Sequence, residues 1–339
     1  MSGADESHCP DGGLSSDESH CPDGDHCADH DHDHDHDHDH DHDHDHDHDH
    51  DHDHDHGRDG GPATTAPVRV LAAGAAPSSW IRCFHPKPAA RYTLVCFPHA
   101  GGSASYYFDL SAALDADIEM LVVQYPGREN RLFEEPAGSV AALADGVYQA
   151  LRTRLPRRPA FFGHSMGGLI GFEVARRLEA AGGTAPHLLV ASASPAPSVR
   201  TDRLTAGAQA PQGATEPEPE PDEAVLARIM GLGGTRDGVG RHPELMQLVL
   251  PAIRGDLRAL AEYRVDAGAV VGCPVTVFVA DGDHDVPLAE AGAWGAHTTA
   301  DADVHVFEGD HFYFSGNPPK FLELLQDAVR HSHSGTQLI

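Results

Sequence analysis

One serine in this sequence lies in a turn that is typical of a catalytic nucleophile. Residues 163–167 read Gly-His-Ser-Met-Gly, with Ser165 at the centre, and they join an apolar run at 160–162 to a glycine-rich helical pattern at 166–181. A G-x-S-x-G turn between a strand and a helix presents the serine hydroxyl for attack, and its glycines leave room where side chains would collide with the strand or the helix. The first turn of such a helix also directs unpaired backbone N–H groups toward a developing oxyanion. We therefore expect Ser165 to be a nucleophile and the Met166 N–H to be one oxyanion donor.

A serine hydroxyl needs a base with a pKa near 7 and a third group that fixes the tautomer of that base. Two polar loops follow later apolar runs, at 281–287 and at 308–314. His311 in the second loop is the predicted base. For the acid we favour Asp285, because its place three residues after a glycine carries it further into a crevice, and Asp283 remains the alternative. Serine, acid, histidine is the chain order of the α/β-hydrolase triad.

The second oxyanion donor is expected in the loop after an early strand. The apolar run 92–97 leads into Pro-His-Ala-Gly-Gly-Ser at 98–103, where the glycines permit close backbone approach. We assign the donor to the Ala100 N–H. A phosphate cradle is disfavoured, because this loop lacks the G-x-x-x-x-G-K-[ST] pattern.

Short apolar segments rich in β-branched residues alternate with segments of helical periodicity, and this alternation predicts a mostly parallel sheet with helices on both faces. The predicted strands are 80–84, 92–97, 118–125, 160–164, 187–193, 274–280 and 304–307, and the predicted helices are 105–114, 140–155, 166–181, 288–297 and 319–329. In such sheets the reactive groups gather at the carboxyl ends of the strands. The serine, acid and histidine loops all follow predicted strands.

A segment at about 201–263 contains no predicted strand. It begins with a Pro-Glu stretch at 211–221 and becomes helical at 222–230 and 243–263. A helical insertion at this point in the sheet is well placed to act as a lid over the crevice. The alternative is that its apolar residues pack on the core.

Residues 1–65 differ in composition from residues 66–339. They contain fourteen consecutive Asp-His pairs at 29–56, and they hold 22 of the 53 acidic and one of the 23 basic residues. Without apolar side chains to bury, this tail is predicted to be disordered. Imidazoles such as those of His30, His32 and His34 can ligate divalent metals, so metal binding by the tail is one hypothesis, and a repeat without function is the other. Residues 66–339 are the length of one α/β domain.

Several functional classes are disfavoured by composition. The domain is mildly acidic without a basic stripe, which argues against nucleic acid. No apolar run approaches eighteen residues and the N-terminus is acidic, so we expect neither a membrane span nor a secretory signal, and predict a cytoplasmic protein. Cys83, Cys96 and Cys273 show no spacing pattern and are predicted to be small buried side chains rather than disulfide partners.

Taken together, the blocks at 97–102, 124–131, 162–168, 232–235 and 309–312 resemble the stand-alone type II thioesterases of non-ribosomal peptide and polyketide synthases. The resemblance covers about 80–331. It implies an α/β-hydrolase fold and hydrolysis of acyl thioesters from the phosphopantetheine arm of acyl or peptidyl carrier proteins, to clear stalled or misprimed synthases. By the family pattern Ser165, Asp285 and His311 form the triad, and Ala100 and Met166 supply the oxyanion hole; no cofactor is expected. A chain-releasing fatty-acyl thioesterase and a general carboxylesterase are the alternatives.

Overall fold

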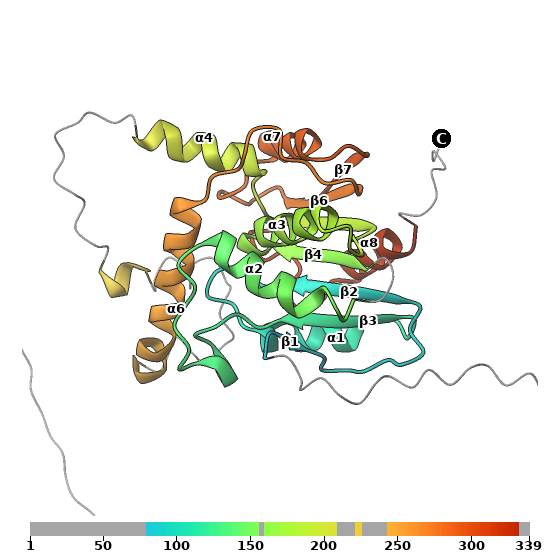
Figure 1. Cartoon of the computed structure of the whole chain (residues 1–339), viewed down its shortest axis with the longest axis horizontal. Helices are drawn as coiled ribbons and strands as arrows, with labels where there is room; N and C mark the ends of the chain where they lie inside the picture. Colours follow the sequence, from blue (N-terminus) through green and yellow to red (C-terminus); the bar gives the residue numbers. More distant parts are fainter. Residues whose placement is uncertain (1–78, 156–158, 209–220, 226–242, 332–339) are drawn as a thin grey trace, which may run out of the picture. The chain divides into compact units, whose positions relative to one another are not determined.

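The computed structural model describes residues 79–155, 159–208, 221–225 and 243–331. The predicted tail at 1–65 and most of the Pro-Glu stretch lie outside these ranges. Figure 1 shows the described chain as a central sheet flanked by helices.

The sheet has seven strands in the order β1-β3-β2-β4-β5-β6-β7. Every neighbouring pair is parallel except β1 with β3. The strands are β1 (Ile81–Arg82), β2 (Tyr92–Phe97), β3 (Ile118–Val123), β4 (Ala160–His164), β5 (Leu188–Ser192), β6 (Val275–Ala280) and β7 (Ala302–Phe307). All seven predicted strands are present. The strand that ends in the serine turn is at the middle of this order, between β2 and β5.

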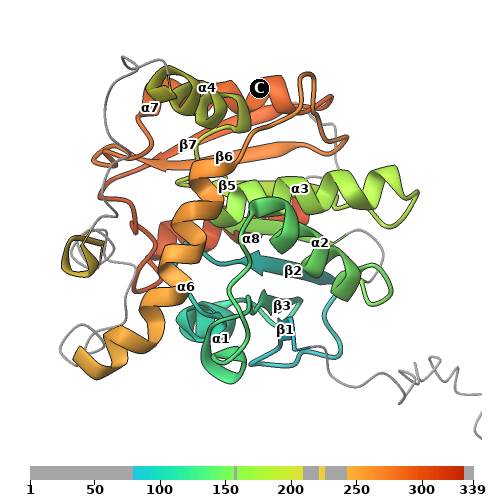
Figure 2. The same cartoon turned by 60° about the vertical axis from the view of Figure 1, so that its left-hand side comes forward.

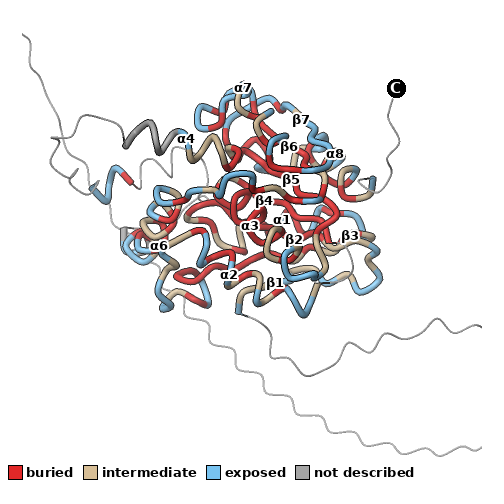
Figure 3. Tube along the Cα trace, turned by 45° about the horizontal axis from the view of Figure 1, so that its top comes forward, coloured by how far each residue is buried: buried red, intermediate tan, exposed pale blue. Residues whose placement is uncertain are grey.

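The inner strands β4, β5 and β6 are buried along their whole length, which explains their nearly continuous apolar sequences, whereas the edge strand β7 is mostly exposed. In β2, Val95 and Phe97 belong to one core cluster, whereas Leu94 and Cys96 belong to a second cluster across the sheet. This is the two-residue alternation of a strand. Figure 3 shows the buried strands at the centre of the described chain.

Helices pack on each face of the sheet (Figures 1 and 2). The first core cluster lies between the sheet and α2 (Val140–Leu151), α3 (Met166–Ala180) and the 3-10 helix η4 (Gly292–His297). The second lies against η1 (Ala104–Tyr107), α1 (Phe108–Ala113) and α8 (Pro319–His331). A short helix η2 (Glu129–Arg131) follows β3. The predicted helix at 288–297 is divided into α7 (Leu288–Ala291) and η4.

The described part of the 201–263 insertion is helical. The turn of helix at 222–225 and α6 (Pro243–Glu262) lie where helices were predicted, whereas α4 (Pro197–Ala208), which enters the insertion, was not predicted. Leu250 and Ile253 of α6 are buried with Val225 in a small separate cluster, and Tyr263 at the other end joins the main core. The insertion therefore packs partly on itself and partly on the core; its action as a lid stays a prediction.

The three described cysteines are free thiols. Cys96 and Cys273 are buried as expected, but Cys83 is exposed, because it follows the two-residue edge strand β1. Burial raises the pKa of Cys273 to about 12 and that of Cys96 well above its ordinary value. Within the described ranges, no helix is long and apolar enough to cross a membrane.

Candidate active site

Ser165 lies in a strained turn between β4 and α3. Its backbone has φ 53° and ψ −120°, a conformation that costs a non-glycine residue free energy and is held only by its surroundings. The Ser165 N–H donates to the Ser192 carbonyl at the end of β5 (2.8 Å). A Cβ added to Gly163 would approach the Gly167 carbonyl oxygen to 2.3 Å, and one added to Gly167 would approach that of Phe97 to 1.9 Å. The glycines are therefore needed for the steric reason that the sequence indicated.

His311 is hydrogen-bonded to Asp283, with 2.8 Å between its Nδ1 and the Asp283 Oδ2. Both side chains are buried. The expectation that Asp285 would hold His311 is wrong, and the alternative Asp283 is the carboxylate at this position. Asp285 is exposed, and its contribution is its backbone N–H, which donates to the Asp283 Oδ1 (2.8 Å).

The Asp283 carboxylate is fixed by its own loop. Besides the Asp285 N–H, the Val286 N–H donates to Oδ1 at 3.2 Å, so that one oxygen is held by the turn and the other faces His311. Burial by itself would raise the pKa of Asp283, but the hydrogen bonds from His311 and the two amides outweigh it and lower the pKa below its ordinary value. Asp283 is therefore a carboxylate at neutral pH.

Backbone hydrogen bonds join the acid loop to the histidine loop. The Asp281 N–H donates to the Phe307 carbonyl (3.0 Å), and the Gly282 N–H donates to the Gly309 carbonyl (2.9 Å). Any side chain at Gly282 would meet that Gly309 oxygen at 2.6 Å. These contacts extend the β6–β7 pairing by two residues and bring position 283 beside position 311. The Asp283 side chain accepts the amides two and three residues later, as aspartates in turns often do, and this contact distinguishes Asp283 from Asp285 in the structure.

The His311 ring lies next to the serine turn. Its centroid is 5.0 Å from that of His164, the residue before Ser165. His164 is fully buried; its Nδ1 is 3.0 Å from the Ser192 Oγ, which in turn is 2.6 Å from the Tyr313 hydroxyl. Burial, and then the neighbouring His311 and His99 rings, lower the pKa of His164 well below its ordinary value. His164 is thus a neutral ring in the wall of the site. Ser192 and Tyr313 were not among the predicted site residues.

The loop after β2 lies against the N-terminus of α3. A Cβ added to Gly167 would lie 1.9 Å from the Phe97 carbonyl oxygen and 2.8 Å from that of Pro98, so the backbone of this loop is in direct contact with the first turn of α3. Ala100 in this loop and Met166, the first residue of α3, are both buried. The structure thus brings the two predicted oxyanion donors to the same end of the sheet as Ser165.

In the described parts of the chain, no group of three or more His, Cys, Asp or Glu side chains is arranged to hold a metal ion. The tail histidines His30, His32 and His34 lie outside the described residues, and metal binding by them stays a hypothesis.

Comparison with known families decides the class of protein. The model of the thioesterase domain family matches residues 92–329, most of the described chain. This chain belongs to the thioesterase family. Thioesterase PikA5 of Streptomyces venezuelae is 41% identical over 237 residues, which are 70% of this chain and 80% of that protein.

Solved structures agree with this family assignment. The type II thioesterase BorB from the borrelidin biosynthetic cluster is 38% identical, with a TM-score of 0.64 over 76% of this chain and all of BorB. YbtT, a type II thioesterase from the yersiniabactin NRPS/PKS biosynthetic pathway, is 26% identical, with a TM-score of 0.61 over 76% of this chain and all of YbtT. The thioesterase shares their α/β-hydrolase fold, which confirms the predicted fold class.

Proposed function

We propose that this thioesterase is a serine hydrolase that removes acyl groups from the phosphopantetheine arm of carrier proteins. Ser165 is the nucleophile, His311 the base and Asp283 the group that orients the base. The observation that carries the proposal is the buried hydrogen bond between His311 and Asp283, formed beside the strained turn that holds Ser165.

In the first half of the reaction the Ser165 Oγ attacks the thioester carbonyl carbon. His311 takes the hydroxyl proton on Nε2 while its Nδ1–H remains donated to Asp283, and the new C–O bond leaves negative charge on the former carbonyl oxygen. The N–H groups of Met166 and Ala100 stabilise that charge. When the oxyanion collapses, the C–S bond breaks, and His311 returns its proton to the departing sulfur.

In the second half, water hydrolyses the acyl-serine. His311 removes a proton from the water, the hydroxide adds to the ester carbonyl, and a second oxyanion forms in the same place. Its collapse releases the carboxylic acid and returns the proton to the Ser165 Oγ. A thiol with a pKa of about 8.5 leaves easily, so the chemistry needs little beyond the base and the two N–H donors.

The proposed substrate follows from the relatives. BorB and YbtT are described as type II thioesterases of biosynthetic clusters or pathways, the latter of NRPS/PKS type. By analogy the natural substrates here are acyl thioesters on acyl or peptidyl carrier proteins, and the role is the clearance of stalled or misprimed synthases.

Turnover of an acylated carrier protein by wild type and by Ser165→Ala tests the proposal. We expect the substitution to abolish turnover, and Ser139→Ala, which removes a serine that caps α2, to retain it. A fluorophosphonate should label wild type at Ser165. Turnover that survives Ser165→Ala would reject the mechanism. Equal or faster turnover of a matched oxygen ester would favour a general carboxylesterase.

A further inference from the structure

Asp256 links α6 to the loop that follows β2. It is 1% exposed, and its Oδ2 accepts a hydrogen bond from the Gly101 N–H (2.7 Å), although the two residues are 155 positions apart. The same oxygen is paired with the guanidinium of Arg128, which is also buried. A buried carboxylate without such a partner would be strongly destabilising. The ion pair thus allows an acceptor from the insertion to reach the backbone of the Ala100 loop.

Two further amides of this loop are held by side chains from the segment after β3. The Ala104 N–H donates to the Gln124 Oε1 (2.8 Å), and the Ser105 N–H donates to the Glu129 Oε1 (3.2 Å). Of these three side-chain acceptors, Asp256 is the one that comes from α6, and its partner Gly101 is adjacent to Ala100. The described loop is therefore positioned from two sides.

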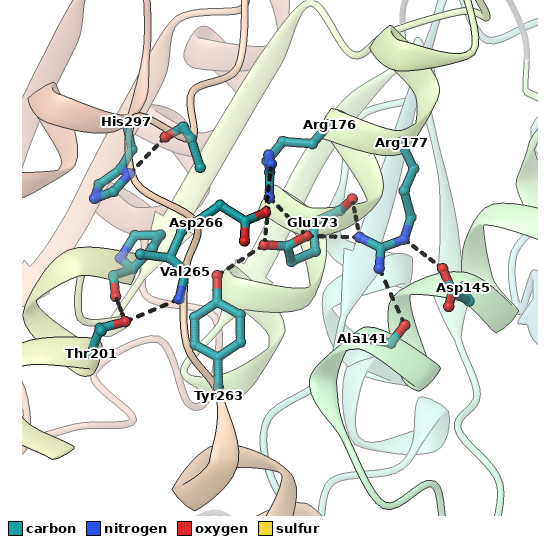
Figure 4. Close-up of polar contacts among 12 residues, drawn as sticks. Ala141, Asp145, Glu173, Arg176, Arg177, Thr201, Tyr263, Val265, Asp266 and His297 are labelled. Carbon is teal, nitrogen blue, oxygen red and sulfur yellow. Dashed lines mark hydrogen bonds and ion pairs between the residues drawn. The ribbon is translucent and has the colours of Figure 1, made fainter. Parts of the chain in front are cut away.

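The position of α6 itself is fixed at two places. Near Asp256, a Cβ on Gly255 would lie 2.8 Å from the Pro136 Cβ, which shows how closely the helix backbone approaches that segment. Just beyond its C-terminus, the Tyr263 hydroxyl donates to the Glu173 Oε1 of α3 (3.1 Å), as Figure 4 shows. Glu173 is also paired with Arg177. The helix that carries Asp256 is thus anchored to the helix that begins at the serine turn.

We propose that Asp256 is a positioning residue of the hydrolysis reaction, which holds the Ala100 N–H in line with the developing oxyanion. The inference rests on the proposed function, in which Ala100 is an oxyanion donor. The Gly101 N–H belongs to the same peptide plane as the Ala100 carbonyl, so holding this plane restrains ψ of Ala100 and with it the neighbouring peptide that carries the Ala100 N–H. Gly101 has φ 74°, and a glycine has little conformational preference of its own. The Gly102 N–H donates to the His99 carbonyl (3.0 Å) and closes the turn that contains Ala100, and the Asp256 carboxylate holds this turn against α6.

Two variants separate the acceptor from the charge. Asp256→Asn keeps an oxygen for the Gly101 N–H and removes the charge. The double variant Asp256→Leu with Arg128→Met removes the acceptor without leaving a buried charge unpaired, and apolar replacement of a whole buried pair is often tolerated. Asp222→Asn is the matched control, because it removes an exposed ion pair that Arg254 of α6 forms away from the loop.

We measure kcat and KM for hydrolysis of an acyl thioester. The kcat value is expressed per active site, and the concentration of active sites is determined by fluorophosphonate labelling of Ser165. We also measure the inhibition constant of an acyl trifluoromethyl ketone. Addition of Ser165 to this ketone forms a C–O bond and an oxyanion, whereas a thioether of the same chain length binds without one. For the double variant we expect kcat to fall about 10- to 100-fold. Complete loss of an oxyanion donor costs about 100- to 1,000-fold, and a donor that is only misplaced should cost less. We expect KM and thioether binding to be unchanged and the ketone to bind more weakly by a similar factor.

Asp256→Asn should retain most of the wild-type kcat, and Asp222→Asn should behave as wild type. If the double variant keeps wild-type kcat per site and ketone affinity, Asp256 is merely structural and the inference is wrong. Should that variant not fold, Asp256→Val with Arg128→Leu, which likewise removes the acceptor and both charges together, is assayed in the same way and judged by the same outcomes. Failure of the serine mechanism on which the inference rests gives a different result, since wild type would then not be labelled at Ser165.

Discussion

The exchange of Asp283 for asparagine tests the assignment of the acid most directly. The Asp283 Oδ1 accepts two backbone N–H groups, from Asp285 and Val286. In Asp283→Asn the amide oxygen must occupy that place, because an NH2 group there would face two donors. The NH2 group is then turned toward the Nδ1 of His311, 2.8 Å away in the native protein. His311 can accept this hydrogen bond only with its proton on Nε2, the nitrogen that has to receive the proton of Ser165.

The substitution therefore keeps the shape of the site and produces the wrong tautomer of the base. Loss of the orienting carboxylate in this way costs about 10⁴-fold in kcat in a serine protease. We expect about 10³- to 10⁴-fold here, or about 4 to 5.5 kcal/mol of transition-state stabilisation, at the lower end because a thiolate leaves with less help from an acid. KM should change little, since Asp283 has no predicted contact with the substrate.

The assay is steady-state hydrolysis of an acyl thioester by wild type, Asp283→Asn and Asp285→Asn, with urea unfolding of each to show that it is folded. Asp285→Asn is the matched control, because it changes an exposed carboxylate two residues away and keeps the backbone N–H that Asp283 uses. Asp283→Asn with nearly native kcat, or a larger loss in Asp285→Asn than in Asp283→Asn, would refute the reasoning.

Three further outcomes are expected. His164 is neutral in the folded protein and protonated in the unfolded chain below about pH 6.5, so the free energy of unfolding should fall below this pH by up to about 1.4 kcal/mol per pH unit. Urea unfolding at pH 5 to 7 should show a shallower pH dependence for His164→Asn than for wild type, and an equal slope would contradict this. Gly167→Ala should yield little folded protein, since its Cβ would lie 1.9 Å from the Phe97 carbonyl oxygen. A cooperative thermal transition at the wild-type temperature would show that the backbone can move to accommodate the added Cβ, and the prediction would be wrong. Cys96 and Cys273 should resist a thiol reagent at pH 8 until the protein is unfolded, and rapid labelling of either, located by peptide mass, would be evidence against their burial.

The elements of the fold were predictable because they depend on local patterns. The apolar runs and the helical spacings located all seven strands, and β2 and β4 have the predicted bounds. The serine turn was equally clear, since Gly163 and Gly167 are required by contacts within one strand-turn-helix unit and its immediate neighbour. The separation of the acidic tail from the domain rests on composition and stays a prediction.

The choice of acid depended on tertiary structure. Asp283 and Asp285 are two residues apart in one polar loop, and their local sequences do not show which of them meets a histidine from another loop. Backbone hydrogen bonds between Gly282 and Gly309 set the register of the two loops, and with it the carboxylate that faces His311. The link from Asp256 to Gly101 has the same origin. Sequence determined which elements form, because that is governed by neighbours along the chain; packing between distant segments decided which side chains meet at the site.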